Sequence, residues 1–205
     1  MKTYIEYVTT KDGIEYAKWV PSIYYEDICE RLLKLMKGGG QKIYQYGAPF
    51  VLTLVACFES NLNDWLIIDT FNKHGPANYE AIVNGFVSLG PKAKYRIAVS
   101  MMTDNGFQIR EDCSIVKILD ELIDVRNKFV HPNPRFYYRL SKHKTKPKKQ
   151  RFEDHPFSKM RIKDCRGYYA AVRNFDRLFF RQYDRGRIEE NHLIKELEKI
   201  VDASE

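Results

Sequence analysis

Apolar side chains recur every three or four residues over most of the chain, which is the spacing of one helix face. The clearest stretch covers residues 49–72, where one stripe contains Val51, Val55, Phe58, Leu62, Trp65 and Leu66. The same spacing predicts further helices over about 22–37, 78–89, 91–104, 114–130, 163–183 and 188–201. We therefore expect a mostly α-helical bundle whose core is made by helix packing.

Glycine, proline and serine indicate where these helices begin and end. Ser22 is a candidate N-cap for the first helix, which the glycines at 38–40 end. We interpret the glycines and the following Gln41-Lys42 as a linker, because the spacing of a phosphate-binding loop is absent. Pro49 fits the first turn of the long helix, and the His-Gly-Pro at 74–76 closes it.

Two segments depart from the helical pattern. Apolar and polar residues alternate over 3–9 and 14–20, and Lys11-Asp12-Gly13 between them is a turn sequence, so residues 1–20 are expected to form a β-hairpin extension. Residues 135–157 are interpreted as a basic loop insertion. We assign the whole chain, 1–205, to a single helical domain.

The composition excludes several classes of protein. With 44% hydrophobic and 30% charged residues, the chain is neither disordered throughout nor collagen-like. Its four cysteines are far apart and form no C-x-x-C pair, which favours reduced thiols over a disulfide scaffold or zinc finger. No apolar signal segment follows Met1, and the longest apolar stretch, 48–58, is too short to span a bilayer. We expect a cytoplasmic protein that does not associate with membranes.

The net charge of +7 is concentrated in one quarter of the chain. Residues 135–187 hold 17 basic and 5 acidic side chains, whereas residues 1–134 hold 15 and 16. A field confined in this way favours a polyanionic partner. A solvated insertion or a nuclear-import signal would explain the same run. The candidates for contact with a phosphate backbone are Lys142, Lys144, Lys146, Lys148, Lys149 and Arg151. Candidates for stacking on bases are Tyr137, Tyr138, Tyr168 and Tyr169, although the last two are equally suited to packing.

The predicted helix 114–130, which Ser114 is placed to cap, carries an arginine in an unusual position. On a helical wheel, Arg126 lies within about 20–60° of the apolar stripe, whereas Asp120 and Asp124 lie on the opposite, solvent-facing side. A buried guanidinium is costly unless it is paired. Glu59, at the edge of the stripe on the long helix, is the nearest candidate for an ion pair. The alternative is a groove in which Arg126 receives a phosphate.

His131 ends the same helix, because Pro132 disfavours helical geometry in the residue before it. Asn127 and His131 are four residues apart and share one face, so Asn127 is placed to orient the imidazole. The helix C-terminus favours the charged imidazolium and Arg126 opposes it, and an imidazole balanced between its two forms suits acid–base catalysis. The simpler alternative is that His131 only caps the helix.

The segment from Arg126 to Pro132, Arg-Asn-Lys-Phe-Val-His-Pro, resembles the R-N-x-x-x-H signature of HEPN domains, usually written R-x(4–6)-H. These domains are helical bundles found in ribonuclease toxins and in anti-phage and RNA-targeting defence proteins. The upstream helix that bears Glu59 is also similar. In architecture the resemblance covers about residues 22–183, and the N-terminal hairpin and the basic run at 139–151 are outside the pattern.

The resemblance implies a metal-independent endoribonuclease, a toxin or an anti-phage defence effector. The 2′-hydroxyl attacks the adjacent phosphate and leaves a 2′,3′-cyclic phosphate and a 5′-hydroxyl. His131 would act as general acid or base, Arg126 would neutralise the phosphorane, and Asn127 would orient the phosphate or the histidine; Glu59 joins the catalytic candidates. The implied partners are RNA, a second copy of the chain that completes a composite cleft, and a cognate antitoxin or effector. No cofactor or metal is implied.

Two other functions compete with this one. A non-catalytic HEPN-like module would bind RNA or a partner subunit and keep the Arg–His pair for structure. A DNA-binding regulator would use the basic segment, but no helix-turn-helix spacing supports it. The remaining histidines are scattered and are interpreted as surface residues rather than metal ligands: His74, His143, His155 and His192.

Overall fold

The computed structural model describes residues 5–9, 15–19, 21–75, 78–102, 109–130 and 160–185, with side chains except in the strands, at Asn72 and at 178–185. Its elements in chain order are β1 (Ile5–Thr9), β2 (Glu15–Trp19), α1 (Pro21–Met36), α2 (Gln41–His74), α3 (Tyr79–Val87), α4 (Pro91–Met102), α5 (Ser114–Val130) and α6 (Ile162–Arg185). The predicted mostly helical fold is confirmed. The predicted helix 188–201 lies outside the described residues.

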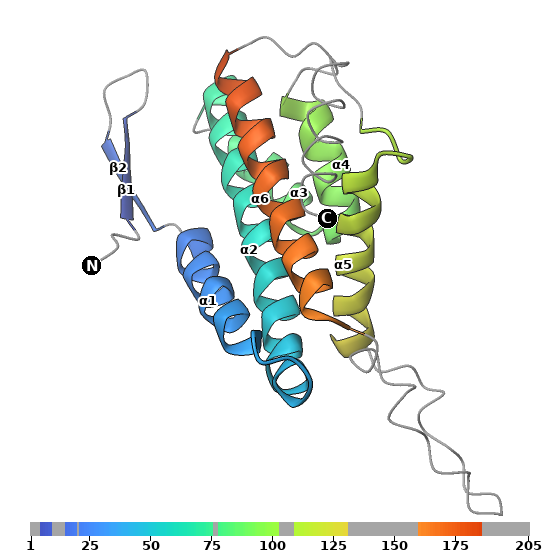
Figure 1. Cartoon of the computed structure of the whole chain (residues 1–205). Coiled ribbons are helices and arrows are strands. Elements are labelled where there is room, and N and C mark those ends of the chain that lie inside the picture. Colours follow the sequence, from blue (N-terminus) through green and yellow to red (C-terminus); the bar gives the residue numbers. More distant parts are fainter. Residues whose placement is uncertain are drawn as a thin grey trace, which may run out of the picture.

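The helices form a bundle around α2, which contacts α1, α3, α4, α5 and α6. In Figure 1, α1 and α5 run antiparallel to α2, and α6 runs parallel to it. The turn from α1 into α2 contains Gly39 and Gly40 at φ 64° and 53°. Glycine adopts this left-handed backbone without steric cost, so the glycines permit a tight reversal between the two helices.

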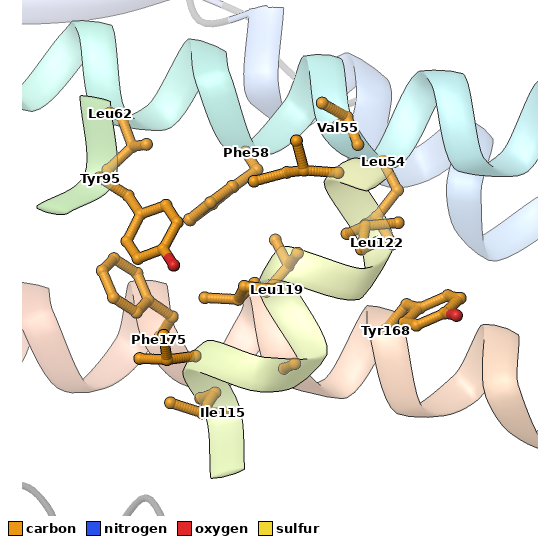
Figure 2. Close-up of a cluster of buried hydrophobic side chains, with 14 of the residues drawn as sticks. Leu54, Val55, Phe58, Leu62, Tyr95, Ile115, Leu119, Leu122, Tyr168 and Phe175 are labelled. Atoms are coloured by element: carbon orange, nitrogen blue, oxygen red, sulfur yellow. The ribbon is translucent and has the colours of Figure 1, made fainter. Parts of the chain in front are cut away.

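The core lies where α2, α5 and α6 meet (Figure 2). The Phe58 ring is at its centre, 5.9 Å from the Tyr95 ring and 5.4 Å from the Phe175 ring, both measured between centroids. From α5, the buried residues are Ile115, Val116, Leu119, Leu122 and Ile123. These positions recur at the spacing of one helix face, which is why the apolar stripe predicted α5 correctly.

The start of α2 differs from the prediction. The helix begins at Gln41, directly after the glycines, and Pro49 lies inside it rather than in its first turn. A proline inside a helix removes one hydrogen bond and costs about 3 kcal/mol. The extra two turns place Ile43 in the core on the same helix as Phe50. Packing of this face against α1 offsets the cost, so Gln41-Lys42 belong to a helix and not to a linker.

Neither serine predicted as an N-cap has that role. Ser22 is buried within the first turn of α1, which begins at Pro21, and its carbonyl accepts a hydrogen bond from the Cys57 thiol at 3.4 Å. Ser114 is the first residue of α5, and its buried hydroxyl has no hydrogen-bond partner in the described part of the chain. Both serines lie one position too far into the helix to cap it.

The two strands pair antiparallel, with Ile5 opposite Trp19 and Thr9 opposite Glu15. The turn predicted at Lys11-Asp12-Gly13 lies outside the described residues.

Within the described ranges, one helix is long and apolar enough to cross a membrane by length and composition alone. This is the 41–71 part of α2, with a mean hydropathy of 1.3 in its most apolar window. The central helix of a bundle meets the same criterion, and that is the position α2 occupies. Its buried positions face the other helices and include Phe50, Leu54, Phe58, Leu62 and Leu66.

The four cysteines are free thiols buried in the bundle. Burial disfavours the thiolate and raises the pKa of Cys29 and Cys165 to about 12. Thiols of this kind pack as small apolar groups and are poor nucleophiles at neutral pH.

Candidate functional site

Arg126 lies in the last turns of α5, half-buried at the surface of the bundle. Its Nη1 donates a hydrogen bond to Oδ1 of the neighbouring Asn127 at 2.9 Å. Among the described residues this is its one hydrogen bond, and none of their carboxylates forms an ion pair with it. Within that part of the chain, the other guanidinium donors therefore remain available to an anion.

Glu59 is not the partner of Arg126. Figure 2 shows Leu54 of α2 beside Leu122 of the antiparallel α5. Arg126 lies one turn beyond Leu122 and Glu59 lies more than one turn beyond Leu54, in opposite directions along the bundle. The register of the two helices therefore separates the carboxylate from the guanidinium.

The carboxylate of Glu59 binds Lys94 of α4 instead. The Lys94 Nζ lies 3.2 Å from Glu59 Oε1 and 3.3 Å from the Val87 carbonyl oxygen, and it is 5.9 Å from the centroid of the Phe86 ring. The Lys94 side chain is only 2% exposed. A buried ammonium needs a counter-charge, so the structure gives Glu59 a structural role between α2 and α4.

Asp120 faces α4 and not the solvent side on which the helical wheel placed it. Its carboxylate accepts hydrogen bonds from the Tyr95 hydroxyl at 2.8 Å and from Arg96 Nη2 at 2.7 Å. Burial, and then the hydrogen bond to Asp120, raise the pKa of Tyr95. One turn further along α5, Asp124 pairs with Lys92 at 2.8 Å. These contacts tie α4 to α5.

The two described tyrosines proposed for base stacking pack within the bundle. The buried Tyr168 donates its hydroxyl hydrogen to Glu121 of α5 at 2.8 Å. The Tyr169 hydroxyl lies 3.1 Å from a carboxylate oxygen of Glu30 and 3.3 Å from one of Glu26, both on α1. Burial is the largest cause that raises the pKa of both phenols. Their hydroxyls link α6 to its neighbours, so packing is the correct interpretation.

Several predicted site residues lie outside the described residues. They are His131, Tyr137, Tyr138, Lys142, Lys144, Lys146, Lys148, Lys149 and Arg151. The flanks of this segment are described: α5 ends at Val130, and the chain resumes at Met160 just before α6. In Figure 1 both flanks lie at the end of the bundle where α1 turns into α2. The basic segment is therefore attached at the same end as Arg126.

A buried carboxyl on α6, Asp176, was missed by sequence reasoning. One of its oxygens accepts a hydrogen bond from the Asn61 amide of α2, and the other is buried without a partner among the described residues. Burial raises the pKa of Asp176 to about 7, although Asn61 and the charge of Arg173 act to lower it. The signal was present, because Asp176 is four residues beyond the buried Val172.

Asp176 is expected to make stability depend on pH. Its folded-state pKa is raised, so between about pH 4 and pH 7 the folded state holds more protons than the unfolded state, and stability falls as pH rises. From pH 5 to pH 8 we expect a loss of about 2–3 kcal/mol of unfolding free energy attributable to this group. Urea denaturation of wild type and Asp176→Asn across this range measures it. The asparagine variant should lose less stability, and parallel pH profiles would refute the assignment.

Across the described ranges, no group of three or more histidine, cysteine, aspartate or glutamate side chains is placed to hold a metal ion. Comparison of the chain with family models, with curated proteins and with solved structures found no match. The site is therefore defined by its own geometry: a half-buried arginine, held by an adjacent asparagine, at one end of a helical bundle.

Proposed function

We propose that the protein is a metal-independent endoribonuclease of the HEPN type. The observation that carries the proposal is the Arg126–Asn127 contact at the end of α5. The guanidinium has no carboxylate partner in the described part of the chain, and it lies five residues before His131 in an R-N-x-x-x-H sequence. A partly buried, unneutralised guanidinium is suited to binding a phosphate.

The reaction needs two proton transfers and one anionic transition state. The 2′-hydroxyl loses its proton as its oxygen bonds to the adjacent phosphorus. The bond from phosphorus to the 5′-oxygen then breaks, and that oxygen gains a proton. His131 performs one of these transfers. Arg126 donates hydrogen bonds to the non-bridging oxygens, where negative charge develops.

Asn127 acts through Arg126 in this proposal. Its amide oxygen takes up one of the guanidinium donors and limits the rotamers of the arginine. A guanidinium held in one orientation loses less conformational entropy when it binds a phosphate. Asn127 is therefore a positioning residue, and Glu59, which binds Lys94, has no part in the reaction.

The proposal includes a HEPN-like arrangement of the helices and a homodimer in which two copies of the motif form one cleft. An interface at this place would account for an arginine beside the apolar stripe of α5. The basic residues of 135–157 would follow the RNA backbone. A cytoplasmic location, and control by an antitoxin or effector partner, complete the proposal.

Incubation of the purified full chain with RNA in EDTA tests the function. We expect fragments without any divalent ion, and a dimer by light scattering. RNA that stays whole at high enzyme concentration would leave the non-catalytic binding module as the function. A strict monomer that still cleaves would remove the composite cleft from the proposal.

A further inference from the structure

Basic side chains gather at the end of the bundle that carries Arg126. Three segments meet there in Figure 1: residues 34–42 at the turn from α1 to α2, 125–130 at the end of α5, and 160–167 at the start of α6. We call these three segments the basic end. Asp164 is the one acidic residue in them. Their basic residues are Lys34, Lys37, Lys42, Arg126, Lys128, Arg161, Lys163 and Arg166.

These cations are mostly unneutralised. All except the half-buried Arg126 are exposed, and Arg161 pairs with Asp164 at 3.6 Å. In the described part of the chain the others form no ion pair. Elsewhere in the bundle most bases have a carboxylate partner: Arg31 with Asp27, Lys73 with Asp69, Lys92 with Asp124, Lys94 with Glu59, Arg96 with Asp120 and Arg173 with Glu26.

Two of these lysines lie where the fold itself would favour an acid. Lys42 and Lys163 are the second residues of α2 and α6, close to the partial positive charge of a helix N-terminus. No acidic residue occupies the first turn of α2, and Gly40 before it provides no side-chain cap. Cations here weaken the helix ends by about 0.3–1 kcal/mol each, so their placement indicates an external anion.

We propose that the basic end is the docking surface for the phosphodiester backbone of RNA and leads the strand to Arg126. The inference rests on the proposed function and names the face by which the substrate binds. Several exposed cations close together bind phosphates by releasing the counterions of the nucleic acid. The Tyr44 side chain, 45% exposed in the first turn of α2, offers an aromatic surface to an unpaired base.

The charge-reversal variant Lys42→Glu/Lys163→Glu tests the surface. Both glutamates fall in first turns, where a negative charge stabilises the helix, so the variant should fold at least as well as wild type. The matched control is Lys117→Glu/Arg177→Glu, which makes the same change in net charge. Lys117 is exposed in the first turn of α5, at its other end, and Arg177 is exposed far along α6.

The probe is a labelled single-stranded 2′-O-methyl oligonucleotide, which has no 2′-hydroxyl and cannot be cleaved by the proposed reaction. Fluorescence polarisation in EDTA over a series of salt concentrations gives its affinity. We expect about tenfold weaker binding by Lys42→Glu/Lys163→Glu at low salt. The slope of log affinity against log salt should fall by about 1.4 for two lost phosphate contacts. The control should change the affinity less than twofold.

Equal losses in the two double variants would mean that affinity follows net charge alone, and would overturn the proposal. Loss of binding to phosphatidylserine vesicles with unchanged oligonucleotide binding would assign the surface to membranes and would also overturn it. The predicted loss in a protein that never cleaves RNA would support the docking surface and refute the proposed function. Cleavage-active wild type with unchanged binding in both variants would do the reverse.

Discussion

Replacing Arg126 with alanine is expected to lower the rate of RNA cleavage about 100- to 1,000-fold, which is typical for loss of one donor to a developing oxyanion. The guanidinium lies at the surface, and its described hydrogen bond is to Asn127, so the fold should tolerate the change. His131→Ala should lower the rate by about 10²–10⁴, the usual contribution of a general acid or base. Single-turnover cleavage in EDTA measures both variants.

Three further variants separate charge, orientation and general basicity. Arg126→Lys keeps the charge but loses the planar fork, so its activity should stay well below that of wild type. Asn127→Ala should have a smaller effect than Arg126→Ala, because it frees the arginine without removing it. Lys117→Ala removes an exposed base near the start of α5 and should leave the rate unchanged. Full activity in folded Arg126→Ala would exclude this arginine from the reaction.

Replacing Lys94 with methionine is expected to destabilise the fold by about 2–4 kcal/mol. Methionine fills a similar volume, but the change leaves the carboxylate of Glu59 without its counter-charge between α2 and α4. Removing one member of a buried ion pair costs about 3–5 kcal/mol, and the 24% exposure of the Glu59 side chain allows water to reduce that cost. Urea denaturation at pH 7 measures the loss.

A double-mutant cycle isolates the pair. Glu59→Gln should also destabilise, because Lys94 then keeps only neutral acceptors. Lys94→Met/Glu59→Gln should be more stable than the sum of the single effects predicts, by about 1 kcal/mol or more. Folded Glu59→Gln should cleave RNA at the wild-type rate, because its carboxylate serves Lys94 and not the scissile phosphate. Strict additivity would show that the two side chains do not interact.

The helices could be predicted because each buries a stripe of apolar residues at helical spacing, as α5 does with Ile115, Leu119 and Leu122. The start of α2 could not, because Pro49 marks a helix start in most sequences. Only the tertiary burial of Ile43 explains why the helix continues through it. Local signals thus gave the interior of each helix more reliably than its ends.

The candidate site could be predicted only in its local part. Arg126 and Asn127 are neighbours on one helix, so their contact depends on α5 alone. Glu59 was assigned to the wrong base, because its partner depends on the register between helices that are far apart in sequence. A helical wheel reports which side of one helix is apolar, and it contains no information about that register. Asp120 was misplaced for the same reason, since α4 covers its side of α5.

The most direct test of the central proposal compares an RNA oligonucleotide with its 2′-O-methyl counterpart, using wild type and His131→Ala in EDTA, with analysis of the fragment ends. We predict that wild type cleaves only the RNA and leaves 2′,3′-cyclic phosphate and 5′-hydroxyl ends, and that His131→Ala cleaves neither. Cleavage of the 2′-O-methyl strand, or equal cleavage of RNA by wild type and His131→Ala, would contradict it.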